Sequence, residues 1–205
     1  MTETGKNKSL SRFKQNRRRD IAEAARRVLA REGYAQLSAR KVAAEAGLSL
    51  GHITYNFSGM DDVLAEAYRV TSEQLREASM RSLATAASNP LARLEAFLRA
   101  GFTDEFLDFH HLRMRIDLWS AACNSDVLAD TERVLYDHYR EALRGLLMPL
   151  AEANPKAVES IPALLDTVMA TQDGLWLDWL RRRDSVAVEN GLRMCVTLVR
   201  STLSC

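Results

Sequence analysis

Apolar residues recur at spacings of three and four along almost the whole chain, which is the pattern of amphipathic α-helices. Proline is rare, at four residues. Asn89-Pro90 and Asn154-Pro155 each pair a capping side chain with a proline at the first helical position. No alternating pattern of useful length predicts a strand, so we expect an all-α fold. The first predicted helix lies at about 12–32, and two short ones lie within 38–57. The next begins after Ser58, with Asp61 completing a capping box, and runs to about 82. Later helices are expected at 90–102, 104–123, 126–152, 162–182 and 186–203.

Residues 38–57 predict two short helices joined by a tight turn. Gly47 ends the first helix, because glycine tolerates the positive φ of a sharp stop. We expect Ser49 to accept a hydrogen bond from a free backbone N–H and so cap the second helix. Ile53 and Phe57 are four apart and share a buried face, so Gly51 and Tyr55 point away from it, and His52 and Thr54 flank the outer face. That face is free of acidic residues, as a recognition helix in a DNA major groove requires; an ordinary αα-corner is the alternative.

Charge is distributed unevenly along the chain. The net charge is +1, but residues 1–60 contain 12 Lys and Arg against 5 Asp and Glu, and the other 145 residues contain 16 against 22. A basic end on an acidic body predicts one module that faces a polyanion. We expect residues 1–16 to form a basic flexible arm, which is either a solvated tail or a phosphate contact. Arg17, Arg18 and Arg19 are candidates for contacts with phosphates or the minor groove.

Composition argues against several other classes of protein. Apolar residues make up 47% of the chain, which excludes disorder, and no stretch approaches the ~20 apolar residues of a membrane span. No apolar run follows the basic N-terminus as in a signal peptide. The three cysteines, Cys123, Cys195 and Cys205, are an odd number and widely spaced, which favours reduced thiols in a cytoplasmic protein. His110 and His111 diverge on a helix, so no metal or other cofactor is expected. The remaining alternative is an α-helical enzyme or interaction adaptor, although no catalytic motif occurs.

Within residues 21–64 a set of residues is similar to the DNA-binding domain of the TetR family of bacterial repressors. The matching residues are Ala25, Gly33, Ser38, Arg40, Val42, Ala43, Ala46, Gly47, Leu48, Ser49, Gly51, Ile53, Tyr55, Phe57 and Leu64. The family usually has Lys three residues after the Phe and often a His before it, where this chain has Met60 and Asn56. Ser58 and the free N–H groups that open the next helix are the candidate replacements for the phosphate contact of that Lys.

The resemblance implies a DNA-binding domain at 17–60 and a ligand-binding and dimerisation domain at 61–205, with about nine helices. It implies a ligand-responsive repressor that binds a palindromic double-stranded DNA operator as a homodimer and is released by a small-molecule inducer. Asp117-Leu118-Trp119 and Asp173-Gly174-Leu175-Trp176-Leu177 are similar to the BetI-type branch, named for choline-responsive repressors. The expected DNA contacts are Arg17, Arg18, Arg19, Ser38, Arg40, Ser49, Leu50, Gly51, His52, Thr54, Tyr55, Asn56 and Ser58.

Two further sets of candidates come from the later helices. Aromatic rings beside an acidic residue suit a cationic ligand, although rings at helical spacing are more often core. The ligand candidates are Phe106, Trp119, Tyr139, Asp173 and Trp176. The apolar stripes of the last two helices suit a four-helix bundle between two protomers, although part of each stripe must serve the core. The interface candidates are Leu165, Val168, Trp179, Leu192, Val196 and Val199.

Overall fold

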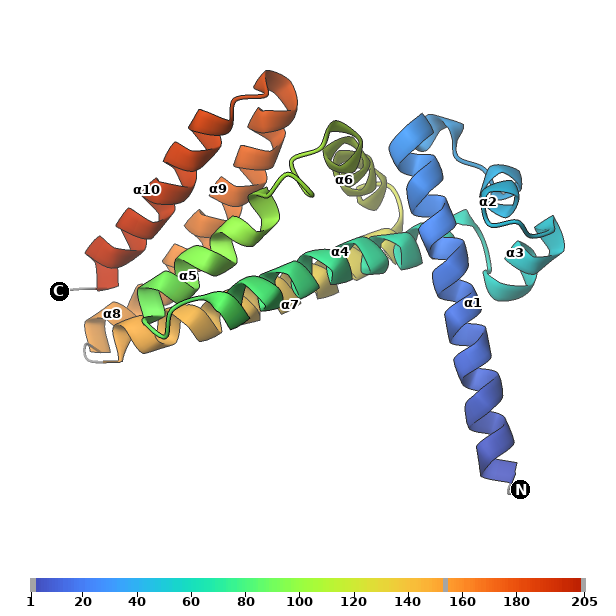
Figure 1. Ribbon diagram of the computed structural model, residues 1–205, viewed down its shortest axis with the longest axis horizontal. Helices are drawn as coiled ribbons and strands as arrows, with labels where there is room; N and C mark the ends of the chain where they lie inside the picture. The colour runs from blue at the N-terminus through green and yellow to red at the C-terminus, as the bar shows by residue number, and fades with distance from the viewer. Residues whose placement is uncertain (1–2, 153–154, 204–205) are drawn as a thin grey trace. The chain divides into compact units, whose positions relative to one another are not determined.

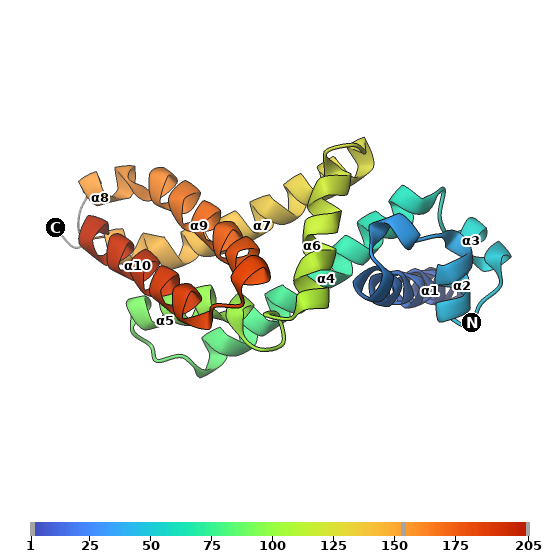
Figure 2. The ribbon, with the colours of Figure 1, turned by 90° about the horizontal axis from the view of Figure 1, so that it is seen from above.

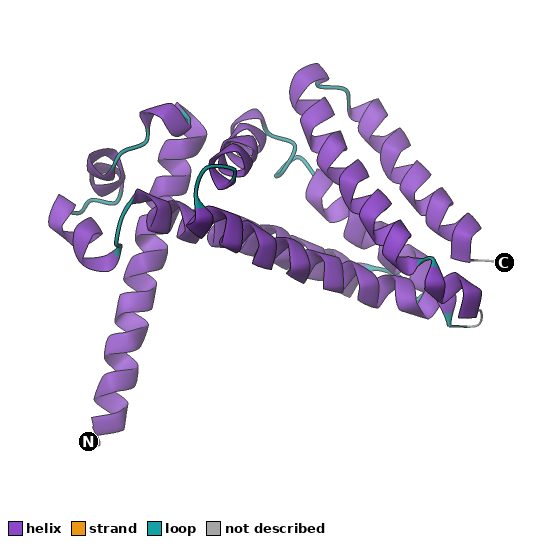
Figure 3. Cartoon of the chain, turned by 180° about the vertical axis from the view of Figure 1, so that it is seen from behind, coloured by secondary structure: helices purple, strands orange, loops and turns teal. Residues whose placement is uncertain are grey.

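A computed structural model of the protein describes the backbone of residues 3–152 and 155–203 and the side chains of residues 12–152 and 156–203. These residues form ten α-helices and two short 3-10 helices without a strand (Figures 1 and 3), which confirms the all-α prediction. The elements are α1 (Glu3–Glu32), η1 (Tyr34–Gln36), α2 (Ala39–Glu45), α3 (Leu50–Asn56), α4 (Met60–Thr85), α5 (Pro90–Arg99), η2 (Ala100–Phe102), α6 (Phe109–Ala122), α7 (Asp126–Ala151), α8 (Pro155–Glu159), α9 (Ile161–Arg182) and α10 (Ser185–Leu203).

The described chain divides into two compact units. The first contains the residues up to Glu73 together with Arg113–Arg133, and the second contains Gln74–Leu112 and the residues from Val134 onward. Helices α4, α6 and α7 each cross from one unit to the other. The segment 113–133 therefore folds with the N-terminal helices, a grouping that the helix pattern in the sequence does not indicate.

Two helix starts differ from those expected. Helix α1 begins at Glu3 instead of near Arg12, since residues 6–31 contain no glycine or proline to interrupt it. Helix α6 begins at Phe109 instead of 104, because the Asp108 carboxylate accepts hydrogen bonds from the backbone N–H groups of His110 (2.9 Å) and His111 (3.0 Å). An acceptor at this place satisfies donors that the first turn leaves open, and so fixes the start of the helix.

The predicted cap at Asn89 is confirmed, because its side chain accepts hydrogen bonds from the N–H groups of Leu91 (2.8 Å) and Ala92 (3.3 Å). Helix α8 begins at Pro155, and the predicted cap at Asn154 lies outside the described residues.

The core of the first unit brings α1, α2 and α3 together. Small and branched residues of α1 pack against the inner faces of the two short helices and the start of α4. The buried members of this cluster are Ile21, Ala24, Ala25, Val42, Ala43, Ile53, Phe57, Val63 and Ala67. Helices as short as α2 and α3, with seven residues each, are not stable alone, so the position of each depends on packing against α1.

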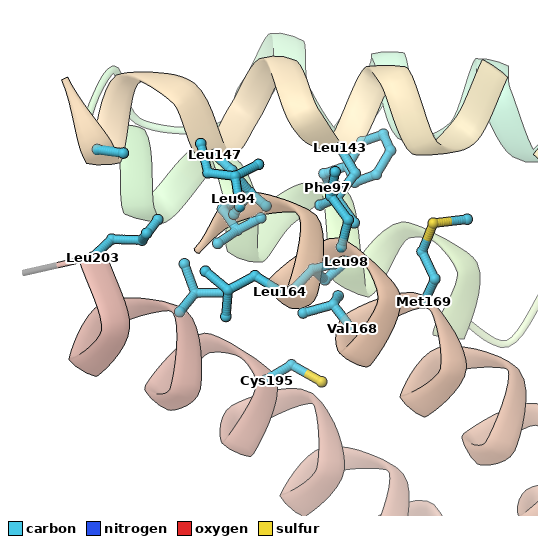
Figure 4. Close-up of a cluster of buried hydrophobic side chains, with 14 of the residues drawn as sticks. Leu94, Phe97, Leu98, Leu143, Leu147, Leu164, Val168, Met169, Cys195 and Leu203 are labelled. Carbon is cyan, nitrogen blue, oxygen red and sulfur yellow. The ribbon is translucent and has the colours of Figure 1, made fainter. Parts of the chain in front are cut away.

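The second unit is built around α5, α7, α9 and α10. Figures 1 and 2 show α9 and α10 side by side, and Figure 4 shows their apolar side chains pointing toward those of α5 and α7. A Cβ on Gly191 of α10 would lie 2.5 Å from the Leu175 side chain of α9, so the glycine permits this close approach. Four predicted interface residues belong to this core, because the stripes of α9 and α10 face inward. They are Leu165, Val168, Leu192 and Val199.

Candidate nucleic-acid interface

The turn between α2 and α3 is a sharp helix stop. Gly47 has a φ of +66°, where a side chain is disfavoured, and the Leu48 N–H donates to the Ala43 carbonyl oxygen at 2.9 Å. At the other end of α2, the Ser38 hydroxyl accepts a hydrogen bond from the Lys41 N–H at 3.4 Å. The two short helices are thus bounded by local chemistry, as a helix-turn-helix needs.

Helix α3 turns a polar and aromatic face outward. Ile53 and the following Phe57 are buried in the core of the first unit, as their spacing predicts. Tyr55 lies on the opposite side and is 80% exposed. The other exposed residues of this helix are Leu50, Gly51, His52 and Thr54. This surface contains no acidic group that would repel a phosphate backbone.

Two residues of the predicted DNA set form hydrogen bonds within the protein. Ser49 stands at the N-cap position of α3, but its hydroxyl bonds to Nδ1 of His52 (2.8 Å) and does not cap a backbone N–H. The ring nitrogen competes for the hydroxyl because it is three residues away on the same helix side. Asn56 is only 7% exposed, and its amide donates to the His52 carbonyl oxygen at 2.8 Å. Asn56 is therefore a buried helix-end residue and not a base contact.

Arg18 of α1 contacts the end of the helix-turn-helix and the start of α4. Its guanidinium lies 4.0 Å from the centre of the Phe57 ring, donates to the Asn56 carbonyl oxygen, and forms an ion pair with Asp62 at 2.9 Å. The Glu66 carboxylate lies 3.7 Å from Nη2 of Arg18, the nitrogen that pairs with Asp62. These contacts join α1, the end of α3 and the first turn of α4. Arg18 is accordingly engaged within the protein, which removes it from the set of expected phosphate contacts.

The start of α4 differs from the predicted capping box. The Asp62 carboxylate, and not that of Asp61, accepts from the Ser58 N–H (3.2 Å) and hydroxyl (3.4 Å), because α4 begins at Met60 and Asp62 occupies its third position. Burial alone raises the pKa of Asp62, but the bonds from Arg18 and Ser58 together lower it. The Ser58 N–H is thus occupied, and Met60 packs against the core.

The first unit also carries cations that have no acidic partner within the described residues. Arg12, Lys14, Arg19 and Arg40 are exposed, and Arg17 lies 5.5 Å from the centre of the Phe13 ring. Most other cations of this unit form ion pairs with neighbouring carboxylates. Glu45, for example, accepts from Arg27 (2.8 Å) and Arg31 (3.1 Å), and these hydrogen bonds lower its pKa.

The predicted ligand residues are divided between the two units. Trp119 belongs to the first unit, with the Arg115 guanidinium 5.6 Å from its ring, whereas the other four belong to the second. There Gln172 accepts a bond from the Tyr139 hydroxyl at 3.0 Å and donates to the Leu98 carbonyl oxygen at 3.2 Å.

The buried Trp176 donates to the Gly101 carbonyl oxygen at 2.8 Å and stacks on Phe102. Phe106 is buried as well, and Asp173 is half-buried. The polar atoms of the two rings, Tyr139 and Trp176, are therefore satisfied by internal bonds.

The predicted interface residues Trp179 and Val196 are half-buried and pack against the core of the second unit. The large apolar side chains that α9 and α10 expose are different ones: Leu177, Val186, Met194 and Leu198. The helical pattern alone could not separate the outward face from the inward one, because both carry apolar residues.

Two negative findings apply to the part of the chain that the structure describes. No helix there is long and apolar enough to cross a membrane. No group of three or more His, Cys, Asp and Glu side chains is placed to hold a metal ion.

Comparisons with known proteins match both parts of the chain. The profile of bacterial regulatory proteins of the tetR family matches residues 21–67, and that of the C-terminal half of BetI-type transcriptional repressors matches residues 90–204. The HTH-type transcriptional regulator BetI of Stenotrophomonas maltophilia (strain R551-3) is 27% identical over 165 residues, which are 78% of this chain and 80% of that protein.

Two solved structures share the fold. A transcriptional-regulator structure from Pseudomonas aeruginosa PAO1 is 29% identical, has a TM-score of 0.77, and is matched over 93% of this chain and 91% of that one. A regulator from Saccharomonospora viridis in complex with choline is 22% identical, with a TM-score of 0.71 and coverage of 91% and 96%. The family consists of transcription regulators and not of enzymes. This chain belongs to the TetR family of bacterial regulatory proteins, with a C-terminal half of the BetI type, and is a DNA-binding transcriptional regulator.

Proposed function

We propose that this regulator reads its operator with α3. The observation that carries the proposal is the exposed, acid-free face of α3, centred on Tyr55. Ile53 and Phe57 anchor this helix from behind, so its outer residues are held in a fixed orientation. A recognition helix of this kind places such residues against base edges in the major groove.

Phosphate contacts come from cations that the protein does not use internally. Arg40 stands on α2, two residues after the capping residue Ser38, and Arg17 and Arg19 stand on α1. Arg12 and Lys14 are two further exposed cations of α1, nearer the N-terminus. Contacts from these residues give affinity and salt dependence, while α3 gives sequence preference.

The functional form is a homodimer through the outward faces of α9 and α10. Val186, Met194 and Leu198 form an exposed apolar row on α10, and Leu177 is exposed on the neighbouring α9. Pairing of these faces with those of a second copy makes a four-helix arrangement and removes the apolar side chains from water. A two-fold dimer presents two recognition helices to a palindromic operator.

A small molecule that binds in the second unit releases the DNA. The half-buried Tyr139 is bonded to the buried Gln172 there, the buried Trp176 stacks on Phe102, and a regulator with the same fold was solved with choline. An inducer acts only if it binds the DNA-free conformation more tightly than the bound one. Cations that aromatic faces attract, choline among them, are the first ligands to test.

The experiment is selection of duplexes from a random DNA library with the purified full-length protein. An enriched sequence with two-fold symmetry, bound by a dimer, supports the proposal. Enrichment of no sequence, or binding that is equal for all duplexes, contradicts it. Candidate ligands are then titrated into the complex, and an inducer must release the DNA as well as bind.

A further inference from the structure

The segment 113–133, which we call the elbow, joins the helix-turn-helix from outside the DNA-binding sequence. Arg113 of α6 donates through Nη2 to the Ala30 carbonyl oxygen near the end of α1, at 2.6 Å. One helical turn later, the Asp117 carboxylate accepts from the Tyr34 backbone N–H at 3.0 Å. The partners are 83 residues apart in both bonds, so the elbow is a long-range support for this turn.

These two bonds enclose the glycine that turns the chain from α1 toward α2. Gly33 has a φ of +83°, and a Cβ built on it would lie 3.8 Å from the Asp117 carboxylate and 3.9 Å from the Arg113 guanidinium carbon. A side chain at this bend would therefore meet both residues at van der Waals distance. Because η1 and α2 follow directly, the direction of this bend sets where α2 and α3 begin.

The elbow is also bonded to α4, on the other side of the helix-turn-helix. The Ser125 hydroxyl donates to the Asp61 carboxylate at 2.7 Å. The Arg69 guanidinium donates to the Thr131 hydroxyl at 3.1 Å. The elbow thus holds both elements that flank α2 and α3 in the chain, and all four bonds lie within the first unit.

We propose that the elbow fixes the orientation of the helix-turn-helix, and that Arg113 and Asp117 are positioning residues which set the distance between the two recognition helices of the dimer. This inference rests on the proposed function. Two half-sites are bound together only when the recognition helices match their spacing along the duplex. Both residues bond charged groups to the backbone, and such bonds hold a bend more firmly than neutral ones.

The test measures how affinity depends on half-site spacing. The operator selected by the full-length protein is resynthesised with base pairs inserted or removed at its centre. The wild-type protein should strongly prefer the original spacing. Asp117→Ala and Arg113→Met should reduce that preference by about tenfold, the order expected for a lost charged hydrogen bond. Asp117→Asn keeps an acceptor for the Tyr34 N–H and should restore the preference.

Asp130→Ala is the matched control, because this elbow carboxylate pairs with Arg133 one turn away and should leave the spacing preference intact. The proposal is overturned if the variants lose affinity equally at every spacing, or if Asp117→Asn behaves like Asp117→Ala. If Asp117→Ala does not fold, Ser125→Ala supplies the same comparison, because it removes one hydroxyl from the other side of the elbow. Failure of the wild-type protein to select any DNA refutes the proposed function instead.

Discussion

Replacement of Tyr55 by Ala isolates the recognition surface from the stability of the domain. The Tyr55 side chain is 80% exposed, and the residues that anchor α3 lie on the opposite side. Surface substitutions of this kind change the free energy of unfolding by no more than about 0.5 kcal/mol. Loss of a base or phosphate contact costs about 1–3 kcal/mol of binding free energy, or roughly 5- to 150-fold in Kd.

The assay is a fluorescence-anisotropy titration of the selected operator, with thermal unfolding of each variant followed in parallel. Tyr34→Ala is the matched control, since this tyrosine is 44% exposed in the same unit but lies on η1, away from α3. The backbone N–H of Tyr34, which bonds to Asp117, is retained in the control. We expect weaker operator binding for Tyr55→Ala alone, with both variants unfolding near the wild-type temperature.

Wild-type affinity in Tyr55→Ala would refute the assignment of this face of α3 to the DNA. An equal loss in both tyrosine variants would also refute it, because the effect would then not depend on α3. A Tyr55→Ala protein that unfolds at a much lower temperature would contradict the exposed position of the ring.

Three further predictions concern assembly, pH and the arm. Met194→Glu should give monomers that still fold, since Met194 is 63% exposed, whereas Val134→Glu on α7 should remain dimeric in light scattering. Asp62→Asn should lower the unfolding temperature at neutral pH. The unfolding temperatures of the two proteins should converge as the pH falls below 3.8, the ordinary pKa of this carboxyl. The bonds that lower the pKa of Asp62 stabilise only its ionised form, which is lost on protonation. Deletion of residues 1–16 should weaken binding to all duplexes similarly and flatten the salt dependence.

The helix-turn-helix could be predicted because its determinants are local. Gly47 marks the stop, and the spacing of Ile53 and Phe57 fixes the inner face of α3. Once that face is known, the exposure of Tyr55 follows from helix geometry. Helix ends were less certain, because the carboxylate that caps a helix, such as Asp108 or Asp62, can stand at several neighbouring positions.

Other features depend on contacts between distant parts of the chain. The apolar pattern of α9 showed that the helix has a buried face, but not that Val168 serves its own protomer while Leu177 faces outward. Nothing near Arg113 or Asp117 in the sequence indicates that their partners lie 83 residues earlier. The partners of such residues can be assigned only from the fold, because the apolar periodicity of a helix shows which of its faces is buried but not which element covers that face.

Part of the basic charge of the N-terminal region is paired with carboxylates inside the protein. Five of its cations, among them Arg18 and Arg27, are held by carboxylates of the same unit. Of those with described side chains, five remain: Arg12, Lys14, Arg17, Arg19 and Arg40. At about 0.9 counterions released per phosphate contact, a dimer that used them all would have a salt slope of about −9. A steeper slope would require the lysines before Arg12 or the opening of internal ion pairs, so this measurement connects the packing of α1 with its function.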